Sequence, residues 1–104
     1  MERVANTRLT KRQISFLRGL GQRLRPALHV GREGCTERTQ QALAEILTRN
    51  ELVKVRVLPS AGVTAREVAA VLAEAAGAAL VGVVGHTFVL YRPNPELKER
   101  IVLE

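Results

Sequence analysis

The first regular hydrophobic pattern of the chain follows Thr10. Thr10 and Gln13 have the spacing of a capping box, in which each residue satisfies a backbone N–H of the other. The pattern stops at Pro26, because proline has no N–H to donate and disfavours helical geometry in the residue before it. We therefore predict an amphipathic helix from Thr10 to about residue 25, with Ile14, Leu17, Leu20, Gly21 and Leu24 on its apolar side.

A second helical pattern begins after Thr36, a residue type that favours the N-cap position. It continues to about Arg49, and Asn50 is expected to end the helix in the left-handed conformation. The predicted buried side is formed by Leu43, Ile46 and Leu47.

A third helical pattern repeats the capping box of the first, with Thr64 as N-cap and Glu67 as its partner. It ends at Gly77, because glycine adopts the left-handed conformation without steric cost. Its inward positions are predicted to be Val68, Val71, Leu72 and Ala75.

Four short runs have the character of β-strands, at residues 27–30, 51–58, 79–84 and 87–92. In the second run, valines alternate with Lys54 and Arg56, which predicts a sheet with a charged, solvent-exposed face. Gly85 at the first position of a two-residue turn favours a type II′ hairpin between the last two runs. The order α-β-α-β-α-β-β predicts an α/β protein with a four-stranded mixed sheet and helices packed against it.

The length of 104 residues fits one domain, and 46% hydrophobic with 25% charged residues is typical of a chain that folds. We place a basic tail at residues 1–8 and the domain at residues 9–95. Residues 96–104 form a C-terminal tail for which a frayed end is favoured over a short amphipathic turn.

Membrane and cofactor functions are disfavoured by composition. No apolar run is long enough to span a bilayer and the N-terminus lacks an apolar signal core, so a cytoplasmic location is expected. One cysteine cannot form an internal disulfide, and with two histidines it falls short of a zinc cage. We therefore expect no metal and no cofactor.

The formal charge of +6 is unevenly distributed. Residues 1–32 carry a net charge of +7, whereas residues 33–104 are almost neutral. A positive field at one end is typical of a protein that binds a polyanion, although such charge also serves solubility, and the pattern alone leaves both open. The basic candidates of the first helix and its end are Lys11, Arg12, Arg18, Arg23 and Arg25.

The sequence Gly31-Arg32-Glu33-Gly34 lies between the first strand and the second helix. Glycines let the backbone approach a phosphate, and the helix that follows offers unpaired N–H groups. The GXXG loop of KH domains clamps a nucleic-acid backbone in this way. A tight turn that needs two glycines for positive φ explains the same residues, and the carboxylate of Glu33 counts against phosphate binding.

Three aromatic residues are too few for a base-stacking platform. Phe16 and Phe88 are expected in the core, and Tyr91 is left open between the core and an RNA contact. Base-specific recognition is therefore not predicted.

An enzymatic function has little support, since the chain contains no Asp and no nucleotide-binding fingerprint. Cys35 near a helix start could act as a nucleophile with His29 or His86 as base, but no third orienting residue is evident. Packing explains Cys35 better, and His29 is expected to be structural. His86, at the tip of the hairpin, is expected to be exposed and able to contact a phosphate.

Four segments carry a combined pattern in this order: residues 9–18, with Leu9, Thr10 and Gln13; residues 30–37, with the Gly31–Gly34 loop; residues 51–55; and residues 84–92. Together they resemble the CRM domain family, which includes the bacterial YhbY proteins and plant chloroplast splicing and ribosome-maturation factors. The resemblance implies a fold similar to the C-terminal domain of bacterial translation initiation factor three, with a GxxG loop at the RNA surface. It also implies association with ribosomal RNA in precursors of the large ribosomal subunit. We expect the protein to be a monomer.

The resemblance assigns the RNA-loop motif to Gly31, Arg32 and Gly34, and recurrent basic positions to Lys54 and Arg92. Glu33 and His86 depart from the family pattern, which often has a small or neutral residue and an arginine there. A protein-interaction module within a ribonucleoprotein particle remains the alternative, and charge alone also permits DNA binding. The full set of candidate RNA-binding residues is Gly31, Arg32, Gly34, Lys11, Arg12, Arg18, Arg23, Arg25, Lys54, Arg56, His86 and Arg92.

Overall fold

The order of elements agrees with the sequence prediction. The structure is a computed structural model that describes residues 9–103, so the predicted basic tail at residues 1–8 lies outside the described residues. The elements are α1 (Lys11–Gln22), β1 (Leu28–Val30), α2 (Glu37–Arg49), β2 (Leu52–Val57), the 3-10 helix η2 (Pro59–Ala61), α3 (Ala65–Ala76), β3 (Ala79–Val84) and β4 (Thr87–Tyr91).

The four strands form one mixed sheet in the order β1-β2-β4-β3, which confirms the predicted fold class. β1 and β2 are parallel, because α2 carries the chain back between them, and the other neighbours are antiparallel. In the β3–β4 turn, Gly85 has φ +59° and no other residue type has positive φ among the described residues, which fits the predicted type II′ geometry.

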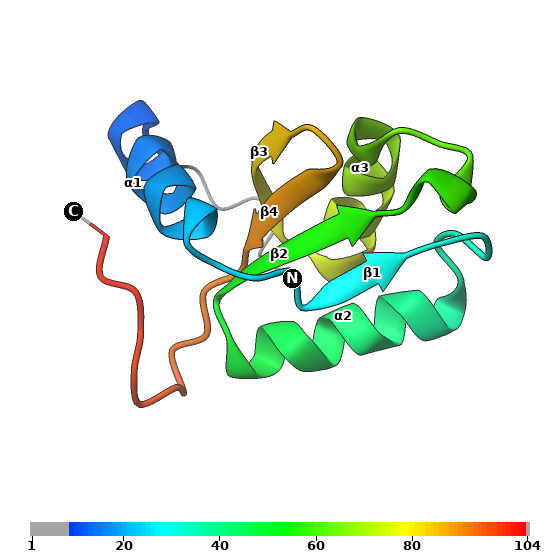
Figure 1. Ribbon diagram of the computed structural model, residues 1–104. Coiled ribbons are helices and arrows are strands. Elements are labelled where there is room, and N and C mark those ends of the chain that lie inside the picture. The colour runs from blue at the N-terminus through cyan, green and yellow to red at the C-terminus, as the bar shows by residue number, and fades with distance from the viewer. Residues whose placement is uncertain (1–8, 104) are drawn as a thin grey trace.

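Helices cover both faces of the sheet (Figure 1): α2 and α3 lie on one face and α1 lies on the other. The larger core, on the α2–α3 face, contains Phe88 and Val55, both fully buried. The smaller core is built around Leu17 of α1. The second face was predicted to be charged and wet, but α1 covers half of it, where Leu52, Val81, Val89 and Tyr91 are buried.

Both predicted capping boxes are present. The hydroxyl of Thr10 accepts the N–H of Gln13 at 3.1 Å, and the hydroxyl of Thr64 accepts the N–H of Glu67 at 3.1 Å. The prediction for Asn50 is wrong, because this residue is extended, with φ −140° and ψ 120°. Its side chain instead bonds back to a carbonyl of the last helical turn, which satisfies the same orphan group.

Two predictions of burial are also wrong. Val71 is 49% exposed and Ala75 is exposed, because α3 contacts the sheet through Ala65, Val68, Ala69 and Leu72 instead. Phe16 is 48% exposed, since α1 turns Leu17 toward the sheet and leaves its neighbour outside. On α3, the small side chains of Ala65 and Ala69 let the helix lie close to the strands, so Val71 is not needed for this packing.

The C-terminal tail is docked on the protein, which corrects the prediction of a frayed end. The carboxylate of Glu51, only 3% exposed, accepts the N–H of Asn94 at 2.7 Å and that of Ile101 at 2.8 Å. It also pairs with Arg100 at 3.0 Å. Burial alone raises the pKa of Glu51, but these three donors outweigh burial and hold the pKa below its usual value. Ile101 and Leu103 then pack against the core beneath α1.

Candidate nucleic-acid interface

The loop between β1 and α2 is a tight turn closed by its two glycines. The N–H of Gly34 donates to the carbonyl of Gly31 at 2.9 Å, which leaves Arg32 and Glu33 exposed at the tip. The hydroxyl of Thr39 on α2 donates to the Gly34 carbonyl at 3.1 Å. The loop is therefore fixed to the first turn of the helix that follows it.

The two glycines of this loop have different roles. Gly34 has φ +71°, a conformation that other residues adopt only with strain. Gly31 has no positive φ, and a Cβ there would meet only Ser60 Oγ at 3.5 Å and Leu58 Cδ1 at 3.6 Å, which are ordinary contacts. The turn thus requires glycine at position 34, whereas the fold gives no reason for glycine at position 31.

The charge of the loop itself is balanced. In the turn, Arg32 is followed directly by Glu33, and in the first turn of α2, Glu37 is followed directly by Arg38. The hydroxyl of Thr36 caps one of the helical amides, that of Thr39, at 3.2 Å. The loop supplies backbone donors and one arginine, and a net positive field has to come from its neighbours.

The neighbouring charge lies on the half of the sheet that α1 leaves uncovered. His29 of β1 is the register partner of Arg56 of β2, and Arg56 in turn pairs with Thr87 of β4. The carbonyl of His86 accepts the N–H of Val57 at 2.7 Å, which brings the hairpin tip to the same end of the sheet. We call this surface the open half-face; its side chains are His29, Lys54, Arg56, Val84, His86 and Thr87.

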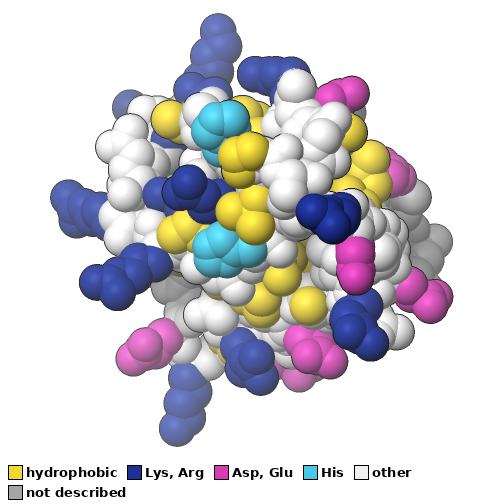
Figure 2. Space-filling view, turned by 45° about the vertical axis from the view of Figure 1, so that its right-hand side comes forward, with side chains coloured by type: hydrophobic (Ala, Val, Ile, Leu, Met, Phe, Trp, Pro, Cys, Tyr) yellow, Lys and Arg dark blue, Asp and Glu magenta, His cyan; other side chains and the backbone are white. Residues whose placement is uncertain are grey.

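The open half-face contains cations, imidazoles and neutral groups but no carboxylate. Figure 2 shows both histidines on one side of the molecule with Lys and Arg side chains around them, while most carboxylates lie in the other half of the view. His29 was expected to be structural, but it is exposed and belongs to this surface. Strand alternation could have identified it, since Leu28 and Val30 on either side face the larger core.

The basic residues of α1 are exposed but are not all near the loop. In Figure 1, α1 and the β1–α2 loop lie at opposite ends of the sheet. Lys11 and Arg12 lie in the first turn of α1, and Arg12 is close to the C-terminal tail, where it lines a small pocket with Val102 and Leu103. Arg18 reaches toward β3, where its Nε donates to the carbonyl of Val81 at 3.1 Å. A ligand that contacts both regions has to extend along the open half-face.

The sequence profile of the CRS1 / YhbY (CRM) domain matches residues 9–92. The chain belongs to the CRM domain family. An RNA-binding protein of Haemophilus influenzae is 35% identical, with 88% of this chain and 93% of that protein covered. The Bacillus subtilis protein named probable RNA-binding protein YqeI is also 35% identical, with 88% and 95% covered. The solution structure of the hypothetical protein SAV1595 from Staphylococcus aureus matches with a TM-score of 0.73 and 31% identity, over 92% of this chain and 100% of that one.

In this CRM domain, Arg92 lies on the face of the sheet that α2 and α3 cover, opposite the open half-face. Its Nη1 donates to the carbonyl of Ala76 at 2.9 Å and its Nη2 donates to that of Ala44 at 3.2 Å, so it joins α3 to α2. The alternation of β4 explains this position, because Arg92 has the parity of Leu90, which faces the larger core. We therefore remove Arg92 from the candidate interface, since its guanidinium is used within the fold.

Of two further candidates in the CRM domain, Tyr91 is buried and Cys35 is half-buried. Tyr91 is 3% exposed in the core beneath α1, and burial followed by the charge of Glu51 raises its pKa. This position resolves the open alternative for Tyr91 in favour of the core. Burial also raises the pKa of Cys35, which favours the neutral thiol over the nucleophilic thiolate.

The described part of the CRM domain contains no group of three or more Cys, His, Asp or Glu residues arranged to bind a metal ion. Among residues 9–103, no helix combines the length and apolar character that a membrane crossing demands. Of the candidate residues, the loop lies beside one end of the open half-face, and Arg18 borders the half-face at Lys54.

Proposed function

We propose that this protein binds RNA through the Gly31–Gly34 loop and the open half-face, and that its RNA is ribosomal RNA in precursors of the large subunit. The observation that carries the proposal is that a carboxylate-free basic surface adjoins a loop whose first glycine the fold does not require. The relatives named as RNA-binding proteins support the coarse part of the proposal. It implies a cytoplasmic protein that acts as a monomer.

The mechanism is backbone recognition. Without a Cβ at Gly31, a phosphate can approach the turn closely, and Arg32 adds a charge-assisted hydrogen bond. Lys54 and Arg56 then contact further phosphates along the strand, and His29 and His86 offer ring nitrogens at the edge. Because phosphates are the same in every sequence, shape rather than base identity selects the RNA.

The decisive test compares Gly31→Ala with Gly19→Ala, measured by fluorescence anisotropy with labelled fragments of large-subunit ribosomal RNA. Each variant adds one methyl group, and a Cβ at Gly19 would have no neighbour within 4 Å. We expect Gly31→Ala to weaken binding about tenfold, or ~1.4 kcal/mol, without lowering Tm. Gly19→Ala should bind like the parent protein, and equal binding by both variants would remove the loop from the site.

A charge test uses Arg32→Gln and Arg49→Gln, which each remove one positive charge, the first from the loop before α2 and the second from the last residue of α2. The two positions are separated by roughly 20 Å of helix. Binding by the parent protein should weaken with salt, with a slope of log K against log salt of about −3 to −5 for four to six phosphates. Arg32→Gln should make this slope shallower by about 0.7–0.9, and Arg49→Gln should leave it unchanged.

The assembly step is tested in cells. Ultraviolet crosslinking of the tagged protein, followed by sequencing of the bound RNA, should recover large-subunit ribosomal RNA, and recovery from subunit precursors should exceed that from mature ribosomes. Recovery of only small-subunit or messenger RNA would contradict the ribosomal part of the proposal while leaving RNA binding in place.

A protein-interaction module is the second candidate, and one observation favours it. Phe16 and Val102 are 48% and 76% exposed beside each other along a pocket of α1 and the tail. Exposed apolar side chains of this kind suit a protein contact. Purified protein that binds no ribosomal RNA fragment, but is retained on purified ribonucleoprotein particles, would favour this function.

A further inference from the structure

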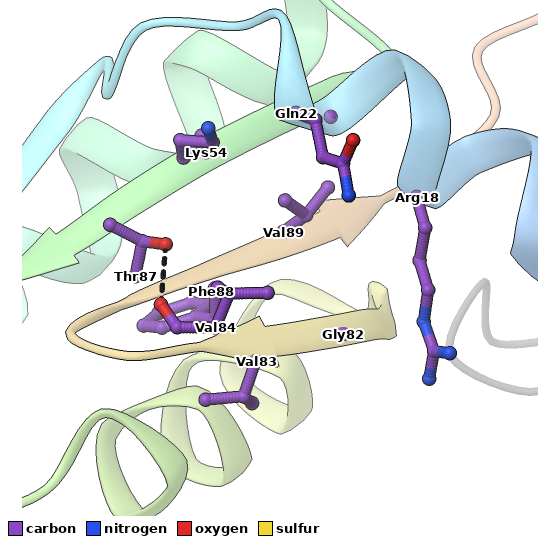
Figure 3. A pocket seen from close by; sticks show the side chains of 10 residues that line it. Arg18, Gln22, Lys54, Gly82, Val83, Val84, Thr87, Phe88 and Val89 are labelled. Atoms are coloured by element: carbon purple, nitrogen blue, oxygen red, sulfur yellow. Dashed lines mark hydrogen bonds between the residues drawn. The ribbon is translucent and has the colours of Figure 1, made fainter.

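A groove separates the end of α1 from the β3–β4 hairpin (Figure 3). Its volume of about 550 Å³ falls in the range of sites that hold small molecules, roughly 300–1,000 Å³. The wall is formed by α1 and the floor by β2, β3 and β4. The side chains that carry its chemistry are Arg18, Gln22, Lys54, Val84 and Thr87.

The charge of the groove selects an anion. Among the described residues that line the groove, Arg18 of α1 and Lys54 of the central strand β2 are the only charged ones. Neither cation pairs with a carboxylate in the described part of the chain. Two cations without a carboxylate partner favour a ligand that carries a negative group.

Arg18 is held in place by the strand beneath it. Its Nε donates to the carbonyl of Val81 at 3.1 Å, and a Cβ on Gly82 would lie 2.9 Å from the same Nε. The missing side chain at Gly82 therefore lets the arginine lie against β3. The register shift between Leu80 and Gly82 turns both Val81 and Gly82 toward α1. Because Nε is fixed, the terminal nitrogens of Arg18 are oriented in advance and lose little entropy on binding.

The floor of the groove is shaped for an apolar face with a polar edge. Val84 is 72% exposed there, which is unusual for a valine in a strand. Figure 3 shows the amide of Gln22 directed into the groove from α1. The hydroxyl of Thr87 donates to the carbonyl of Val84 at 2.9 Å, which leaves its oxygen free to accept a hydrogen bond.

From these features we propose that the groove binds one unpaired nucleotide of RNA, with its phosphate on Arg18 and Lys54 and its base over Val84. This inference rests on the proposed RNA-binding function and names the part of the RNA that the open half-face receives. A base inside a duplex has both faces stacked and its edge paired, so only an extruded nucleotide can enter. Gln22 and Thr87 meet the edge of that base.

The test uses two labelled RNA hairpins that differ by one bulged uridine in the stem, with fluorescence anisotropy at fixed salt as the measurement. The parent protein should bind the bulged hairpin about fivefold more tightly than the paired one, the low end expected for a base held without an aromatic ring. The variants are Val84→Glu, which adds a negative charge at the exposed floor, and Gly82→Ala, whose Cβ would displace the Arg18 side chain from β3.

Both variants should reduce the preference for the bulge to near one, and Gly82→Ala keeps the test valid if Val84→Glu fails to fold. The matched control is Val71→Glu, an equally large charge change at an exposed valine on α3, which should keep the fivefold preference. A preference that survives in both groove variants overturns the groove assignment. Equal binding of the two hairpins by the parent protein also overturns it while leaving the proposed function intact, whereas no binding of either hairpin overturns both.

Discussion

One face of the sheet has two halves with opposite properties, although the same strands form them. The half beneath α1 contains Leu52, Val89 and Tyr91, all less than 10% exposed. The open half-face begins at Lys54, two residues after Leu52 on the same face of β2. It is cationic, and α1 does not cover it. In β2 the change from an apolar to a basic residue between positions 52 and 54 marks where the cover of α1 ends.

The difference teaches that the binding surface of this protein is defined by where a helix stops. Alternation in β2 and β4 decides which side chains share a face, but only the docked position of α1 decides which of them meet solvent. Gly21 sets that position, because a Cβ there would lie 2.9 Å from Val89 Cγ2. Close approach at this glycine lets α1 seal its half while the groove remains beside it.

The largest expected effect is on the covered half. Leu17→Ala removes a side chain that is fully buried beneath α1, and should lower the free energy of unfolding by about 3 kcal/mol. Urea unfolding followed by circular dichroism measures this loss. The neighbouring Phe16→Ala, at a residue 48% exposed, should cost less than about 1 kcal/mol. Similar losses in the two variants would mean that α1 does not seal this half.

The C-terminal tail also covers the half of the sheet beneath α1. Glu51→Gln tests how much the docking of this tail contributes to stability. Loss of the buried charge acceptor should cost about 2 kcal/mol at neutral pH, measured by urea unfolding, with the exposed Glu99→Gln as control. The pKa of Glu51 is lowered in the folded protein from 4.5. The stabilisation is therefore complete above about pH 4.5 and is lost as the pH falls through the folded-state pKa. A difference between parent and variant that does not shrink in acid would contradict this role.

A smaller effect is expected on the open half-face. Arg56→Gln should weaken RNA binding about fivefold at ~0.1 M salt, the contribution of one phosphate contact, and should leave Tm unchanged. The control is Arg66→Gln, an exposed arginine on α3 across the sheet. If both variants weaken binding equally, general charge rather than this surface attracts the RNA.

The smallest effect is expected on the outer side of α1. Gly19 is exposed within a helix, so Gly19→Ala should stabilise the protein by about 0.5 kcal/mol. Thermal unfolding should show a small rise in Tm. A fall in Tm would mean that this side of α1 contacts another part of the chain.

Local signals predicted the elements well because their causes are local. Thr10, Thr64 and Gly77 act through hydrogen bonds and backbone angles within a few residues, and each has the predicted role. Arg92 was predicted to bind RNA, and the role of Glu51 was not predicted. The partners of both residues lie on helices and on a tail that are distant in the sequence. Charge pattern cannot distinguish an arginine that binds carbonyls of the fold from one that faces solvent.

The part of the candidate site that depends on local sequence was predicted, and the part that depends on contacts between distant segments was not. The loop sequence identified both glycines but could not separate Gly34, which needs positive φ, from Gly31, which does not. The groove depends on the register of Gly82 and on the path of Arg18 across the sheet. The contact between Arg18 and Gly82 joins α1 to β3, so a pattern within one segment cannot predict it.

The position of Leu17 has a consequence for the growing chain. Its helix is synthesised before the other described elements, yet its packing partners outside the helix begin at Leu52 and extend to Leu103. Helix α1 must therefore wait with its apolar stripe in water while the rest of the protein is made. Charges beside such a stripe oppose association with other chains. The basic residues of α1 and its end, Lys11, Arg12, Arg18 and Arg23, thus reduce aggregation of the nascent chain before the RNA-binding surface has formed.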